Sequence, residues 1–171
     1  MENLTKRSSI MMLAGPVVAL IFSFISMVKY SAEMLGVEIN MQCSFLRTTA
    51  EGGYGGETES ESQWLWKVHD ESLNGTLVLI AFILIIATIV LAVAVAFVPN
   101  IPKIAVAGTS VLAILMIILN YGKYADMCKG VKAAAEYAGD LSGGSPWTLI
   151  VMMIGLAVSA VGAVMAFINK D

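Results

Sequence analysis

The sequence predicts an all-α membrane protein, a bundle of four transmembrane helices with a small external β-hairpin in the first loop. Of its 171 residues, 58% are hydrophobic and 13% are charged, whereas a soluble domain is about half apolar and about a quarter charged. The apolar residues gather in four blocks, at 10–28, 76–98, 104–120 and 147–168, and none contains Asp, Glu, Lys, Arg or His. Each block approaches the roughly 20 residues that cross a bilayer. We therefore expect one integral membrane domain, residues 1–171, surrounded by lipid.

Local signals place the helices at about 10–35, 71–98, 102–137 and 146–168, with external loops at about 36–70 and 138–145. Gly36 suits the position just after a helix, and the acids and serine of residues 70–72 suit a helix start. We expect the third helix to extend beyond the membrane, because one helical face of the extension is apolar. This face comprises Tyr121, Tyr124, Cys128, Val131 and Ala135.

Residues 37–45 alternate strictly between apolar and polar side chains, which predicts a β-strand that extends as far as residue 49. The acidic, glycine-rich residues 50–62 predict a flexible connector. A short return strand then follows around Trp64 and Trp66. The two tryptophans either cover the apolar face of the first strand or anchor at the lipid headgroups; the sequence leaves both open.

Four crossings put the two termini and the 99–103 turn on one side of the membrane. Loops 29–75 and 121–146 lie on the other. The terminal side has four Lys and Arg residues and the opposite side six, so the raw count disfavours an inside N-terminus. The first helix usually dominates, however, and Lys6 and Arg7 precede it, against Lys29 after it. We expect a plasma-membrane protein with cytoplasmic termini and external loops 29–75 and 121–146.

This topology puts both cysteines, Cys43 and Cys128, on the external side. It predicts a disulfide between the strand and the third helix, which would contribute about 4 kcal/mol for a long loop. The alternative is that both are small buried hydrophobic residues. There is no Cys-x-x-Cys sequence, which argues against a dithiol redox enzyme.

We predict no catalytic, cofactor-binding or metal-binding residues. His69 is the only histidine and has no second strong ligand nearby. The Lys and Arg residues form no basic cluster that would indicate binding to nucleic acid. In the last helix, Gly155, Ser159 and Ala163 step by four, with Gly162 beside them. Small residues at this spacing predict a helix-packing seam, either within the monomer or for another subunit.

The layout resembles the claudin-type tetraspan arrangement. It has four helices, a large first external loop with β character, a tight internal turn and a smaller second external loop. That family carries a Trp followed by two cysteines in the first loop, whereas Cys43 precedes Trp64 and Trp66. The resemblance is therefore one of layout, and we carry over no residue role.

These features predict a non-enzymatic tetraspan, a scaffold or accessory subunit that presents the external hairpin loop to a partner. The expected partner is a membrane protein or another copy of the chain, with no cofactor. The alternative is a protomer of an oligomeric channel or small transporter, because small-residue seams also suit subunit contacts. The expected partner-facing side chains of the loop are Phe45, Tyr54, Trp64 and Trp66.

Overall fold

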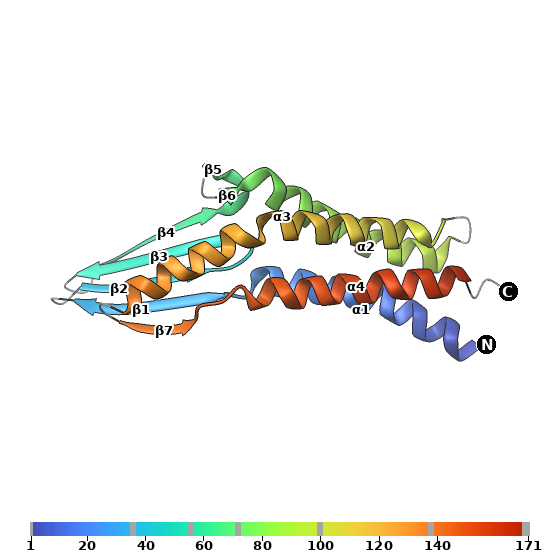
Figure 1. Cartoon of the computed structure of the whole chain (residues 1–171), viewed down its shortest axis with the longest axis horizontal. Coiled ribbons are helices and arrows are strands. Elements are labelled where there is room, and N and C mark those ends of the chain that lie inside the picture. Colours follow the sequence, from blue (N-terminus) through green and yellow to red (C-terminus); the bar gives the residue numbers. More distant parts are fainter. Residues whose placement is uncertain are drawn as a thin grey trace.

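The molecule is elongated and has two parts, a bundle of four helices and a β-sheet that projects from one end of the bundle (Figure 1). The structure is a computed structural model that describes residues 2–34, 37–54, 57–70, 73–98, 101–136 and 139–168. The start of the first helix and the end of the last helix lie together at the end away from the sheet (Figure 1). The sheet and the two ends of the chain therefore occupy opposite ends of the molecule.

The predicted fold class is wrong, because the chain is not an all-α bundle with one hairpin. It contains a five-stranded antiparallel sheet in the order β4-β3-β2-β1-β7. The strands are β1 (Val28–Met34), β2 (Val37–Cys43), β3 (Arg47–Tyr54), β4 (Glu57–Trp64) and β7 (Asp140–Gly143). The element order keeps the expected tetraspan layout, since β1–β4 lie in the first long loop and β7 in the second.

Strand β1 replaces the end of the expected first helix. Helix α1 (Glu2–Phe24) stops well before residue 35. Residues 28–34 alternate between apolar and polar side chains, which is the periodicity of a strand rather than a helix. The backbone N–H of Met27 donates to the carbonyl oxygen of Cys43 at 2.7 Å, so the chain enters the sheet directly after the helix.

The segment expected to be a flexible connector forms the end of β3 and most of β4. Its glycines and acids have low strand propensity, but the register pairs β3 with β2 on one side and β4 on the other. Strand β2 ends at Cys43 rather than at residue 49 because a turn follows. In this turn the Arg47 N–H donates to the Ser44 Oγ at 3.1 Å.

The other apolar blocks form α2 (Gly75–Phe97), α3 (Ile104–Ala135) and α4 (Trp147–Ile168). Helix α2 begins after residue 71, because the side-chain oxygen of Asn74 accepts from the Leu77 N–H at 3.4 Å and caps the helix. A two-residue pair, β5 (His69–Asp70) and β6 (Leu73–Asn74), precedes it.

All four helices are long and apolar enough to cross a membrane, over Arg7–Phe24, Gly75–Val95, Ile104–Ala133 and Trp147–Ile168. Apolar side chains such as Val90, Leu119 and Val161 are exposed on the outside of the bundle. Exposing this apolar surface to water is unfavourable, whereas lipid hydrocarbon tails are as apolar as the surface itself. These features are consistent with a multi-pass membrane protein.

The small residues of α4 lie against α1 of the same chain. Gly155, Ser159, Gly162 and Ala163 are all buried. The Ser159 hydroxyl donates to the Met12 carbonyl oxygen at 2.8 Å, and a Cβ added to Gly155 would lie 2.6 Å from the Gly15 carbonyl oxygen. Within this chain, the seam therefore brings two helix backbones into close approach.

Hydroxyl groups in the spans also bond inside the chain. The Thr88 hydroxyl lies 2.9 Å from the Thr109 hydroxyl and joins α2 to α3. Ser110 donates to the Val106 carbonyl oxygen at 2.8 Å. These groups serve helix backbones and helix–helix contacts.

Candidate interaction site on the sheet

The two faces of strands β1 and β2 differ in polarity. Residues paired across neighbouring strands share a face, so the register places Val28, Ala32, Ile39, Met41 and Cys43 on one side. The C-terminal half of α3 crosses the sheet and contacts β1 and β7 (Figure 1). The other face is polar and carries Lys29, Ser31, Glu33, Glu38, Asn40, Gln42, Thr49, Glu51, Ser60, Ser62, Asp140 and Ser142.

Tyr124 fixes α3 to the sheet. Its hydroxyl donates to the Phe45 carbonyl oxygen at 2.6 Å, and both side chains are fully buried. Their ring centroids are 5.7 Å apart. Cys128 is buried on the same helix, and Val131 packs against the same core. Helix α3 continues to Ala135, and its expected apolar face packs against the sheet through Tyr124, Cys128 and Val131.

The predicted disulfide is not formed. Cys43 and Cys128 are free and buried, and their sulfur atoms are not within disulfide distance. Both fit the alternative interpretation, small hydrophobic residues in the core between α3 and the sheet. The pKa of Cys43 is raised to about 12, mainly because the thiol is buried and secondly because Cys128 lies nearby.

We expect Cys43 to react very slowly with iodoacetamide in the folded protein. Raising the pKa from 9.0 to about 12 lowers the thiolate population at pH 8 roughly a thousandfold, and the thiolate is the reactive form. The measurement is the alkylation rate of the peptide that carries Cys43, followed by mass spectrometry in the folded protein, with the denatured protein as control.

The same pKa shift predicts a pH dependence of stability. The unfolded thiol ionises above pH 9.0 while the folded thiol stays neutral until about pH 12. The stabilisation is therefore complete below pH 9.0 and is lost as pH rises through this window.

For the alkylation experiment, rapid reaction of folded Cys43 at pH 8 would contradict the buried position.

A groove runs along β3 on the α3 side of the sheet. Its floor is low because β3 contributes Ala50 and Gly52, and its cavity volume is about 960 Å³. Strands β2 and β4 supply the walls. We call the α3 side of this cavity the sheet groove; it comprises Val37, Ile39, Met41, Ala50, Gly52, Glu59 and Glu61. The cavity is also lined by Glu51, Gly53 and Ser60, which the register places on the other face of the sheet.

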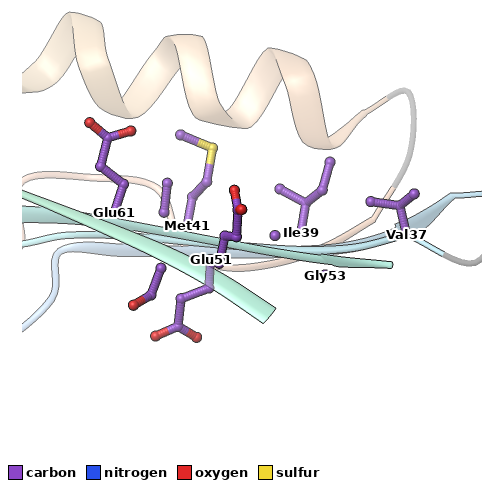
Figure 2. Close-up of a pocket in the computed structure, with 10 residues that line it drawn as sticks. Val37, Ile39, Met41, Glu51, Gly53 and Glu61 are labelled. Atoms are coloured by element: carbon purple, nitrogen blue, oxygen red, sulfur yellow. The ribbon is translucent and has the colours of Figure 1, made fainter. Parts of the chain in front are cut away.

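The walls of the sheet groove have opposite character. Figure 2 shows Val37, Ile39 and Met41 from β2 and Glu61 from β4 on the side of the sheet where the helix lies, with Glu51 on the other face. The register places Glu59 on the same side as Glu61. One wall is therefore apolar and the facing wall is acidic.

A smaller cavity continues the groove beneath α3. It has a volume of about 240 Å³, and Met127 and Val131 of α3 form its roof. It shares Met41, Ala50 and Glu61 with the sheet groove. The two spaces therefore adjoin, and the closed end of the groove is apolar.

Ile39 and Met41 are 38% and 42% exposed. In the described part of the sheet, they are the large apolar side chains with this much exposure. No ion pair of Glu59 or Glu61 occurs among the described residues. Exposed apolar side chains beside unpaired carboxylates form a surface to which a partner can bind.

The structure describes three of the four expected partner-facing side chains, and none of these three lines the sheet groove. Phe45 is fully buried under α3. Trp64 stacks on Trp66 with centroids 4.4 Å apart, and Trp66 stacks on Phe82 of α2 at 6.2 Å. The pairing of Trp64 puts it on the face opposite Met41, so it does not cover the apolar face of β2. Tyr54 ends β3, and its side chain is outside the described set.

The residues of the groove were missed because their exposure depends on register. The alternation at 37–45 predicts a strand with an apolar face, and the sequence leaves open whether the tryptophans cover that face. The pattern does not reveal that α3 covers β1 while the neighbouring part of β2 stays open. The alternating acids of β4 were the available signal, since Glu57, Glu59 and Glu61 recur at the period of a strand.

The fold is α+β, with four helices able to cross a membrane and a folded sheet at one end, and it is consistent with a multi-pass membrane protein. Within the described residues, no group of three or more His, Cys, Asp or Glu side chains is arranged to hold a metal ion. No protein-family model matches the chain, and no curated protein matches it in sequence.

Proposed function

We propose that the protein is a non-enzymatic scaffold or accessory subunit of the plasma membrane that presents the sheet groove to a partner outside the cell. The observation that carries this proposal is the exposed apolar wall of Ile39 and Met41 on a sheet that is otherwise covered or polar. Covering such side chains with a partner removes apolar surface from water.

The attachment of the sheet supports this role. Strand β1 follows α1 after a short link, and Tyr124 ties the β2–β3 turn to α3. A partner bound at the groove would therefore contact a rigid surface joined to the bundle. A rigid surface binds with a smaller loss of conformational entropy than a mobile loop.

The helices favour an accessory role over a channel protomer. The Gly155 and Ser159 seam, which would suit a second subunit, is filled by α1. The threonine pair of α2 and α3 bonds within the chain. These contacts leave the sheet as the surface best suited to partner binding.

The proposed orientation places the termini in the cytoplasm and the sheet outside. Lys6 precedes the first span and Arg7 is its first residue. Lys103 lies in the turn between α2 and α3, and Lys170 follows the last span in the sequence. Lys and Arg close to the first helix favour retention of that flank in the cytoplasm.

One experiment tests both orientation and partner binding. Single cysteines are placed in Cys43→Ala/Cys128→Ala protein, and intact cells receive a membrane-impermeant maleimide that carries a photoreactive diazirine. We expect Ile39→Cys to be labelled and, after illumination, to crosslink to a discrete partner. Asn40→Cys is the matched control, because it is adjacent in sequence but lies on the opposite face.

Pro102→Cys, at the exposed turn between α2 and α3, should be labelled after the cells are permeabilised and not before. Labelling of Pro102→Cys in intact cells would show that the orientation is the opposite of the proposed one. Labelled Ile39→Cys without any crosslinked product, or equal crosslinking from Asn40→Cys, would refute presentation of the groove.

A further inference from the structure

We infer that the sheet groove receives an extended, basic segment of the partner, in which Lys or Arg side chains meet Glu59 and Glu61 and neighbouring apolar side chains meet Ile39 and Met41. This inference rests on the proposed function and specifies the chemistry of the partner. It follows from the shape of the groove, the spacing of its acids and the charge of this end of the molecule.

The width of the groove favours an extended chain. Strands β2 and β4 lie on either side of β3, so their backbones are about 9.6 Å apart. A helix with its side chains is about 10–12 Å across and would contact the side chains of both walls before it reached the floor. An extended backbone fits between the walls.

The floor of the groove is open to such a backbone. A Cβ built on Gly52 would meet no atom within 4 Å, and Ala50 beside it carries only a methyl group. The backbone of a bound segment can therefore approach β3, while its side chains point to the walls.

The acidic wall matches the periodicity of an extended chain. Glu59 and Glu61 are two residues apart on β4 and point to the same face, a separation of about 7 Å along the strand. An extended segment presents every second side chain on one side at the same spacing. Two basic residues separated by one residue would therefore meet both carboxylates.

The charge distribution favours a basic partner over a second copy. Segments 28–74 and 121–146 together carry eleven acidic and six basic residues, a net charge of −5. A second copy in the same membrane would present the same negative charge at the same level. A basic segment is attracted by this field, which is strongest at short range in physiological salt.

The test measures binding of a fluorescent peptide, Gly-Ser-Lys-Val-Lys-Val-Lys-Ser-Gly, to the full chain in nanodiscs of uncharged lipid. Fluorescence anisotropy gives the Kd. The key variant is Glu59→Gln/Glu61→Gln. Its matched control is Glu33→Gln/Glu38→Gln, which removes the same charge from two residues paired on the opposite face of the sheet.

We expect the Glu59→Gln/Glu61→Gln change to raise the Kd about fivefold, as two solvent-exposed ion pairs would. The control should leave the Kd within about 1.5-fold, because its carboxylates lie across the sheet and are screened. Gly52→Leu should also weaken binding, since a Cβ at this position meets no atom within 4 Å and the added side chain fills the floor of the groove.

An unchanged Kd in the Glu59→Gln/Glu61→Gln protein, or equal losses in both double variants, would overturn the inference. The cell crosslinking experiment separates this failure from failure of the proposed function. A partner that still crosslinks to residue 39 when Glu59 and Glu61 are glutamines shows presentation of the groove without recognition of basic residues. Absence of any crosslinked partner refutes the function itself.

Discussion

Replacing Gly155 with alanine is expected to destabilise the bundle by about 2–3 kcal/mol, the cost of overpacking a close contact. The added Cβ would lie 2.6 Å from the carbonyl oxygen of Gly15. The position of a Cβ is fixed by the α4 backbone and the oxygen belongs to the α1 backbone, so rotation of a side chain cannot relieve the contact. Helices α1 and α4 must move apart, which also lengthens the 2.8 Å hydrogen bond from Ser159 to Met12.

The measurement is the unfolding free energy in mixed detergent micelles, followed by circular dichroism. Gly108→Ala in α3 is the matched control, because a Cβ at Gly108 meets no atom within 4 Å. The same change there should be neutral or slightly stabilising, since alanine favours helix more than glycine. Equal stabilities of the two variants would show that α1 and α4 do not meet at this glycine pair.

The bundle could be predicted from the sequence because lipid imposes a simple requirement on a chain. A crossing helix needs about 20 apolar residues, and all its backbone groups bond within the segment. Helix α4 accordingly occupies Trp147–Ile168, and the prediction was residues 146–168. The information that defines each of these helices is local.

Most of the sheet could not be predicted in this way, because its strands depend on distant partners. Strand β7 is ordered by pairing with β1, with Val28 opposite Gly143. Strand β4 has acids, serines and threonine in place of the usual β-branched hydrophobic residues. Composition predicts disorder for such a segment, and only its alternation at a period of two indicates a strand.

The candidate site depends on the same long-range information. The sequence placed Cys43 and Cys128 at the same end of the molecule, and the structure brings both into one core. Their position at the same end of the molecule does not by itself establish a disulfide bond between them. Likewise, Ile39 and Met41 were recognisable as one apolar face, but their exposure follows from the path of α3 over the neighbouring strand.

Replacing Tyr124 with phenylalanine is expected to loosen the sheet from α3 at a cost of about 2 kcal/mol. The change keeps the ring that packs 5.7 Å from Phe45 and removes the hydroxyl that donates to the Phe45 carbonyl oxygen. This carbonyl lies under α3, where an unpaired acceptor costs about 1–3 kcal/mol. The loss falls on the β2–β3 turn, far from the α1–α4 seam.

Hydrogen–deuterium exchange with mass spectrometry can localise this effect. Peptides that cover the β2–β3 turn should exchange roughly thirtyfold faster in the Tyr124→Phe protein, as a 2 kcal/mol loss implies, while peptides of α4 should keep their protection. Tyr121→Phe is the matched control, because the Tyr121 hydroxyl has no hydrogen-bond partner among the described residues. Uniformly faster exchange along the chain would mean that Tyr124 supports the whole fold, and unchanged exchange would mean that its hydroxyl does not hold the sheet. A local effect would identify this hydrogen bond as the link that keeps the sheet groove at a fixed position on the bundle.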